Sequence, residues 1–188
     1  MNHLVKKGVV KGGDERNRIL MELTDEVASL VLADNENQAR AITLDGIRSA
    51  ARYDEFVHFI DDMVGAGVLN RDDDAIPTRA ELMGGAWKGR ALPRPLLAVL
   101  LGHTKMWAFQ MVMETTFPES AAGEPFLAAY FPRQLRESFG AHLKEHVLRR
   151  EIVATAAVNH LINNAGITFI SRLTAETKAG IGEVVAAY

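Results

Sequence analysis

Residues 143–169 read LKEHVLRREIVATAAVNHLINNAGITF, and this stretch decides the fold of the chain. It opens with charged side chains, becomes apolar on almost every face and ends at Gly166. A helix that is apolar all round is stable only when other elements cover it. We therefore expect a buried helix over about residues 142–165, with the other helices packed around it.

A second buried helix is predicted over about residues 94–116. Pro93 and Pro95 stand at its start, where a missing N–H costs nothing because no intrahelical partner exists for it. Its body, residues 96–113, reads LLAVLLGHTKMWAFQMVM and is apolar on most faces. Pro118 then ends the helical pattern.

The remaining pattern is helical as well, since no period-two alternation lies between turn signals. Asp45 and Gly46 predict a break between two helices, and Thr78-x-x-Glu81 predicts a capping box in a loose connector over residues 67–93. Glycines and lysines predict a flexible segment over residues 1–13. The sequence thus predicts an all-α, single-core helical array over residues 14–188.

Composition excludes several classes of protein. The 188 residues carry a net charge of −3, with a pI of about 6.1, which argues against a dedicated nucleic-acid binder. The chain has no cysteine, so disulfides, thiol catalysis and Cys-ligated zinc are excluded. No apolar run of about eighteen residues occurs, so no membrane span is predicted. Residues 1–13 lack the apolar core of a signal peptide. We expect a cytoplasmic protein.

Two histidines, His142 and His146, are spaced to share one face of the predicted helix, with Glu145 beside them. Such a pair can hold a metal ion, but a third ligand at a diagnostic spacing is absent. HLKEH also lacks the glutamate next to the first histidine that metalloproteases use. A half-exposed helix face is the preferred interpretation, and no metal is predicted.

Polar side chains gather at both ends of the 142–165 helix. His146, Arg149, Arg150 and Glu151 precede its apolar part. A guanidinium there can bind a carboxylate of another domain, or form an ion pair within the chain. Asn159 and Asn163 share a face near the other end. Buried amides need partners, and for Asn159 we expect backbone at a helix crossing or loop, with a substrate contact as the alternative.

The usual motifs of catalysis and cofactor binding are missing. The sequence has no GxGxxG after a strand, no Walker sequence and no GxSxG. Its acidic residues fall on predicted solvent faces, so a paired-carboxylate site is not supported. The residues by themselves predict a packing or docking module and no reaction.

The chain resembles the C-terminal helical region of the large bacterial NAD-specific glutamate dehydrogenases. The resemblance runs in matching order through Asn17–Leu20, Thr24–Ala28, Leu30–Leu32, Asp34–Asn35, Gln38, Leu97–Leu101, Lys105, Tyr130–Pro132, Leu135–Arg136, Phe139, His146, Leu148–Ile152, Ala154–Thr155, Asn159, Asn163, Ala165–Gly166, Thr168–Phe169 and Arg172–Leu173. It is weakest over residues 45–89. One departure is Pro93-Arg94-Pro95-Leu96 in place of the family's Thr-Arg-Pro-Glu capping box.

The resemblance implies a fragment of an enzyme that oxidises L-glutamate to 2-oxoglutarate and ammonia with NAD. In that family the catalytic residues and the dinucleotide fold lie upstream of the matched region. It therefore implies no catalytic residue and no cofactor in this chain, with NAD bound elsewhere in the parent enzyme. The implied partners are the catalytic domain of the same polypeptide and further copies in a homo-oligomer. His146, Arg149, Arg150, Glu151, Asn159 and Asn163 are the candidate interdomain contacts.

Two other hypotheses stay open from the sequence. The chain could be a free-standing all-α ligand-binding or regulatory domain, although no basic recognition helix is visible. It could also be a metal-dependent helical enzyme built on His142 and His146. A reading frame that continues upstream into a dinucleotide-binding domain distinguishes the first hypothesis from the enzyme fragment.

Overall fold

The computed structural model describes residues 1–85 and 87–188, and every regular element in these ranges is a helix. The elements are α1 (Asn2–Lys6), α2 (Gly13–Glu22), α3 (Thr24–Ala51), α4 (Tyr53–Gly65), α5 (Arg79–Met83), α6 (Arg94–Met113), the 3-10 turns η1 (Phe117–Glu119) and η2 (Ala121–Gly123), α7 (Glu124–Tyr130), α8 (Arg133–Leu143), α9 (Arg149–Ala165), α10 (Phe169–Thr177) and α11 (Ile181–Ala187). The predicted all-α class is confirmed.

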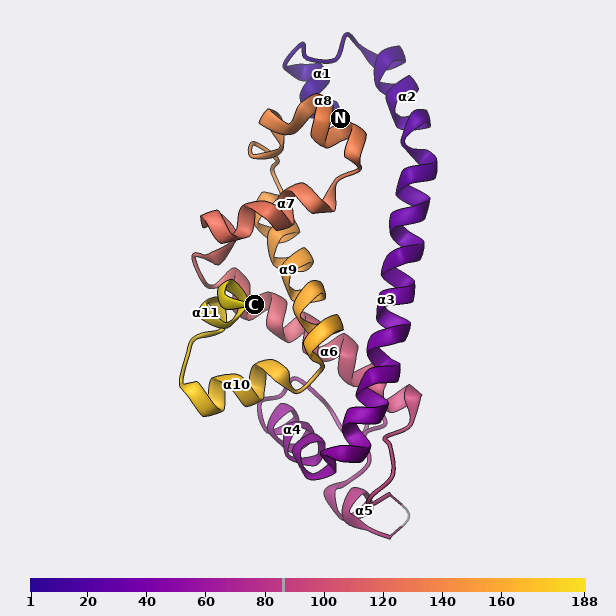
Figure 1. Cartoon of the computed structure of the whole chain (residues 1–188), viewed down its shortest axis with the longest axis vertical. Helices are drawn as coiled ribbons and strands as arrows, with labels where there is room; N and C mark the ends of the chain where they lie inside the picture. The colour runs from indigo at the N-terminus through magenta and orange to yellow at the C-terminus, as the bar shows by residue number, and fades with distance from the viewer. Residues whose placement is uncertain (86) are drawn as a thin grey trace.

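Helices α6 and α9 cross at the centre of the molecule (Figure 1). Helix α9 also packs against α3, α7 and α11, so its apolar faces are covered from several sides. Its buried residues are Ile152, Val153, Ala154, Ala157, Val158, Leu161, Ile162 and Asn163. Both predicted long helices therefore exist, although α6 ends at Met113 and α9 begins later than expected.

The prediction that one helix covers residues 142–165 is wrong at its start. Helix α8 ends at Leu143 and α9 begins at Arg149. Tight turns fill the interval, because His146 N donates to Leu143 O and Arg149 N donates to His146 O. The His146 ring closes the turn, with Nδ1 accepting the N–H of Leu148 at 3.1 Å. His142 and His146 therefore do not share a helix face.

The predicted break at Asp45 and Gly46 is also wrong, because α3 continues to Ala51. Asp45 is fully buried. It accepts hydrogen bonds from Arg48 Nη1 at 2.8 Å and from the backbone N–H of Ile167 at 3.1 Å. Burial raises the pKa of Asp45, against the opposing effect of Arg48. Gly46 lies close to α6, since a Cβ there would be in ordinary van der Waals contact with Leu97 Cδ1, at 3.8 Å.

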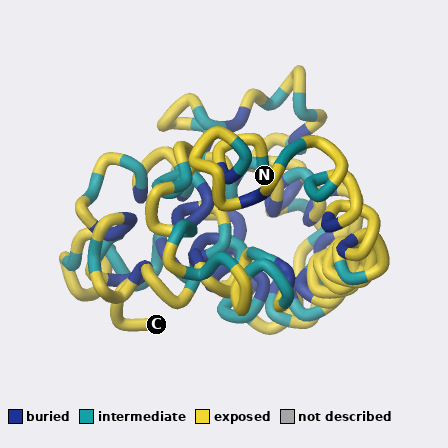
Figure 2. Tube along the Cα trace, turned by 90° about the horizontal axis from the view of Figure 1, so that it is seen from above, coloured by how far each residue is buried: buried dark blue, intermediate teal, exposed yellow. Residues whose placement is uncertain are grey.

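The N-terminal part of α3 stands as a long column beside α7 and α9 (Figure 1). Every residue from 27 to 40 is exposed, whereas the buried residues gather toward the middle of the molecule (Figure 2). Four of these exposed side chains are large and apolar: Val27, Leu30, Val31 and Leu32. Helix α3 packs on the rest of the fold mainly through its C-terminal part, where Ala41, Asp45 and Ser49 are buried.

A small second apolar cluster joins α1, α2 and α8, apart from the large core. It consists of the buried residues Leu4, Val10, Ile19 and Leu23, against which Leu135 and Phe139 pack. The prediction of a single core therefore describes the larger of two clusters. Residues 1–13, expected to be flexible, contain α1 and contribute Leu4 and Val10 to the small cluster. Their mobility stays a prediction.

The connector predicted over residues 67–93 contains α5, and its capping box is confirmed. Thr78 Oγ1 accepts from Glu81 N at 3.2 Å, and Glu81 Oε2 accepts from Thr78 N at 2.7 Å. Residue 86 of this connector lies outside the described residues. The connector as a division of the chain stays a prediction.

Among the described helices, α6 is the one long and apolar enough to cross a membrane by length and composition. It packs against α3, α9, α11 and η1. Its side chains at Leu96, Leu97, Leu100, Leu101, Thr104, Ala108 and Val112 are buried in the protein. The apolar composition of α6 is therefore accounted for by its central place in the core.

Candidate functional site

A groove of about 700 Å³ separates the exposed part of α3 from α7 and α9. At one end its walls are apolar, with Val27, Leu30 and Val31 of α3 across from Phe126 and Tyr130 of α7. These α3 residues lie on one stripe, because positions three and four apart share a helix face. We call this cavity the α3–α9 groove.

The other end of the α3–α9 groove is polar. Asp34 and Asn37 continue the α3 stripe, and α9 contributes Asn159, His160 and Asn163. Asn164 also lines this end, where its Oδ1 accepts from Arg40 Nη2 at 3.2 Å and its Nδ2 donates to His160 O at 2.7 Å. Carboxylate, amide and imidazole groups from two helices thus face one cavity.

Asn163 is the unusual member of this polar end. Its side chain is 7% exposed, and its Oδ1 has no hydrogen-bond partner within residues 1–85 and 87–188. Asn159 is half-buried and lines the same groove. The backbone partner expected for Asn159 is not found in the described part of the chain. Both amides singled out in the sequence therefore meet in one cavity, where their partners would have to come from outside the described residues.

Lys105 of α6 is a half-buried cation whose charge interacts with that of Asp34. Its Nζ is buried and has no hydrogen-bond partner among the described residues. Burial lowers the pKa of Lys105 to about 8, while the carboxylate of Asp34 acts in the opposite direction. Asp34, Asn37 and Lys105 were not predicted as site residues. The available signal was the polar interruption of the Val27–Leu30–Val31 stripe by Asp34 and Asn37.

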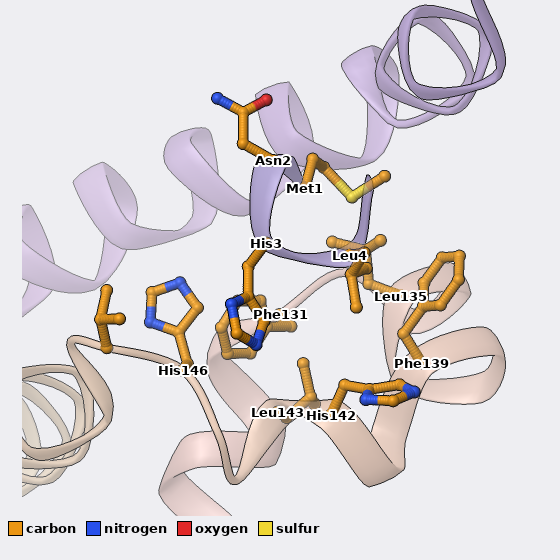
Figure 3. A pocket seen from close by; sticks show the side chains of 11 residues that line it. Met1, Asn2, His3, Leu4, Phe131, Leu135, Phe139, His142, Leu143 and His146 are labelled. Carbon is orange, nitrogen blue, oxygen red and sulfur yellow. The ribbon is translucent and has the colours of Figure 1, made fainter. Parts of the chain in front are cut away.

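A second, smaller cavity of about 350 Å³ lies between α1, α8 and the turns that follow α8 (Figure 3). Apolar side chains dominate its lining, and His3, His142 and His146 line it as well. Figure 3 shows these three rings coming from separate segments of the chain. Within the described residues no three His, Asp or Glu side chains are grouped as metal ligands.

Glu145 connects this cavity to the N-terminal segment. Its Oε2 accepts from Lys7 Nζ at 2.6 Å and lies 3.3 Å from His142 Nδ1. Lys7 is the main reason that the pKa of Glu145 is lowered, and His142 contributes. The His146 ring packs on Phe131 at a centroid distance of 5.7 Å, and burial lowers the pKa of His146. The Lys7–Glu145 pair thus links the residue after α1 to the turn after α8.

The charged residues at the start of α9 have different surroundings. Arg150 donates from Nη2 to Met113 O at 2.7 Å and pairs through Nη1 with Glu119. It therefore makes the structural ion pair that was the alternative to an interdomain contact. Arg149 is half-buried, with an Nε that has no partner in the described chain, and Glu151 is half-buried. An interdomain role for these residues stays a prediction.

Two strongly exposed apolar side chains stand beside His146 in the turns before α9. Val147 is 83% exposed and Leu148 is 52% exposed. Val147 also lines the smaller cavity. We call residues 144–148 the α8–α9 turn. The α8–α9 turn and the α3–α9 groove are therefore two distinct surfaces with apolar and polar groups together.

Comparison with known proteins relates the chain to one family. The family described as "Glutamate dehydrogenase, C-terminal" matches residues 89–188. An NAD-specific glutamate dehydrogenase of Mycobacterium tuberculosis is 37% identical over 173 residues, which is 92% of this chain and 11% of that protein. The enzymes of that name from Pseudomonas aeruginosa and Halomonas elongata are 33% and 32% identical over 184 residues, 96% of this chain and 11% of each.

The chain thus spans about a tenth of the length of the relatives that it matches. The matches cover both surfaces described above, since they include nearly all of its residues. On the family match over residues 89–188, this chain belongs to the glutamate dehydrogenase C-terminal family.

Proposed function

We propose that this chain is the non-catalytic C-terminal helical domain of a large, cytoplasmic NAD-dependent glutamate dehydrogenase. The parent reaction would convert L-glutamate and NAD to 2-oxoglutarate, ammonia and NADH. The observation that carries the proposal is the match of 92–96% of this chain to about a tenth of enzymes with that name. The remaining nine-tenths of such a polypeptide would hold the NAD site and the catalytic residues.

The domain's role in this proposal is assembly. It would dock on the catalytic domain of the same polypeptide, or on another subunit of a homo-oligomer. The α8–α9 turn is the first docking surface that we propose, because it exposes Val147 and Leu148 beside half-buried His146 and Arg149. Exposed apolar side chains rimmed by polar groups are typical of protein interfaces.

The isolated chain is expected not to bind NAD. In isothermal titration calorimetry, NAD titrated into the 188-residue chain should give no more heat than NAD titrated into buffer. The full-length parent enzyme, titrated under the same conditions, is the positive control. Micromolar binding of NAD by the isolated chain would contradict the non-catalytic assignment.

A charge placed on the α8–α9 turn is expected to weaken assembly of the parent enzyme. Val147→Asp should leave the stability of the isolated chain within about 0.5 kcal/mol, because the side chain is exposed. In the parent enzyme, it should shift the mass measured by light scattering toward smaller species, or loosen the domain toward proteolysis.

The matched control for Val147→Asp is Ile47→Asp, which also puts a carboxylate on an exposed apolar position, here 66% exposed on α3. The parent enzyme carrying Ile47→Asp should assemble normally. If both variants weaken assembly equally, or neither does, docking through the α8–α9 turn is wrong.

A further inference from the structure

Residues 27–40 of α3 form a helical segment with few tertiary contacts. All are exposed, on every face of the helix, although Val27, Leu30 and Val31 form an apolar stripe toward the α3–α9 groove. A helical stretch of this length has little stability of its own in water, and most helices gain theirs by packing an apolar face. The apolar stripe of α3 would therefore be stabilised by another element that covers it on the groove side.

The length of the α3–α9 groove suits a short helix. Its α3 wall extends from Val27 to Asn37, which at 1.5 Å per residue is about 15 Å, or about three turns of a partner helix. Both ends of the slot are fixed. At one end Arg133 N donates to Glu26 Oε1 at 2.6 Å, and at the other Arg40 donates to Asn164 Oδ1 at 3.2 Å. The walls are thus held in place before an occupant arrives.

The polar end of the α3–α9 groove determines which chemical groups a bound helix must carry there. Asn163 Oδ1 is a buried acceptor without a donor in the described chain, and a buried acceptor left unpaired costs about 1–3 kcal/mol. Asp34, exposed in the same groove, is a second acceptor. A side chain that donates hydrogen bonds, such as Lys, Arg, Gln or Asn, satisfies both groups.

The source of such a helix follows from the size of the relatives. About nine-tenths of each relative lies outside the region that matches this chain, so most of the parent polypeptide is available to supply it. A second copy of α3 is a poorer fit, because its own stripe presents Asp34 and would place two carboxylates in one slot.

We propose that the α3–α9 groove receives an amphipathic helix of about three turns from the remainder of the parent polypeptide. Its apolar stripe packs between Val27, Leu30, Phe126 and Tyr130, and a hydrogen-bond donor near one end reaches Asn163 and Asp34. This inference rests on the proposed function and adds a second docking surface, distinct from the α8–α9 turn.

Hydrogen–deuterium exchange compares the same helix in the isolated chain and in the parent enzyme. Amides of residues 27–40 should exchange rapidly in the isolated chain, since all of these residues are exposed and few tertiary contacts hold them. In the parent enzyme they should be protected about a hundredfold or more. Equal exchange rates in the two proteins would overturn the proposal. The proposed function would still stand if the parent assembles and responds to Val147→Asp.

Two substitutions on α3 provide a matched pair. Leu30→Asp places a charge in the groove, and Leu32→Asp places the same charge on an exposed α3 position that does not line it. Both isolated variants should unfold like the unsubstituted chain. In the parent enzyme, Leu30→Asp should abolish the added protection of residues 27–40 and Leu32→Asp should preserve it. Equal effects of the two variants would contradict the assignment of the groove.

Photo-crosslinking identifies the occupant. A benzophenone side chain at Ala156, which lines the groove from α9, is introduced into the parent enzyme and irradiated. Crosslinked peptides from the parent sequence outside this chain would support the proposal. Peptides from residues 27–40 of a second copy, or no crosslinked peptide from either source, would overturn it.

Discussion

Gly166→Ala is expected to lower the free energy of unfolding by about 3–5 kcal/mol, one of the two largest effects that the structure predicts. Gly166 has φ 104° and ψ 165°, a region of backbone space that essentially only glycine occupies. A Cβ there would lie 2.7 Å from Asp45 Oδ1 and 2.8 Å from Arg48 Nη1. Both atoms belong to the ion pair of buried Asp45 and half-buried Arg48 that holds the end of α9, so they cannot move without loss.

That ion pair is why the strain cannot relax locally. Asp45 accepts from Ile167 N at 3.1 Å, and Arg48 Nη2 donates to Asn164 O at 2.8 Å. Moving Asp45 away from a new methyl group would leave buried polar groups unpaired, and breaking such a pair is strongly destabilising. Urea unfolding followed by circular dichroism measures the loss.

The control for Gly166→Ala is Gly102→Ala in the middle of α6. No atom lies within 4 Å of the added Cβ, and the backbone there is helical. Because alanine favours the helix over glycine, Gly102→Ala should stabilise the protein by about 0.5–1 kcal/mol. A Gly166→Ala protein as stable as the unsubstituted one would refute the strain and the clash together.

The main helices could be predicted from local pattern because each carries its own signals. Proline starts α6, a glycine ends α9, and long apolar stretches mark both as buried. The positions of two helix ends could not be predicted, because they depend on contacts distant in sequence. Asp45 and Gly46 signal a turn locally, yet Asp45 is used by Ile167, 122 positions further along. The start of α9 depends likewise on the His146 side chain, which turns back onto its own backbone.

Only part of the candidate site could be picked out from the sequence, and its location could not. The amides Asn159 and Asn163 were recognisable because polar side chains are unusual in an apolar helix, where they need hydrogen-bond partners. Their meeting with Asp34 depends on how α3 is placed beside α9, and helical periodicity says nothing about that. The sequence could not decide whether Arg150 binds a partner inside or outside the chain. In the structure its partners are Glu119 and the backbone carbonyl of Met113 at the end of α6, which are distant in sequence.

Lys105→Met is expected to raise the free energy of unfolding at pH 7 by about 1–3 kcal/mol. The ammonium group of Lys105 is buried without a hydrogen-bond partner in the described chain. Burial therefore penalises its charged form and lowers its pKa from 10.5 to about 8. Methionine fills similar space without a charge. The substitution also removes the attraction between Lys105 and Asp34. This loss offsets only part of the gain in stability, because Asp34 is exposed and its charge is screened by solvent.

The pH dependence of this effect has a definite sign. Between pH of about 8 and 10.5 the unfolded chain holds a proton on Lys105 that the folded chain has released, so the unsubstituted protein gains stability as pH rises through this window. Lys105→Met lacks that gain. Its advantage at pH 7 should therefore shrink progressively by pH 10.

Paired denaturation curves at pH 7 and pH 10 test this, with Lys6→Met as the control because Lys6 is exposed on α1. All other ionisable groups are the same in both proteins, so their contributions cancel in the difference. An advantage of Lys105→Met that stays constant with pH would mean that packing, not charge, is responsible. A destabilised Lys105→Met protein at pH 7 would mean that the attraction between the ammonium group and Asp34 outweighs the cost of burying the charge.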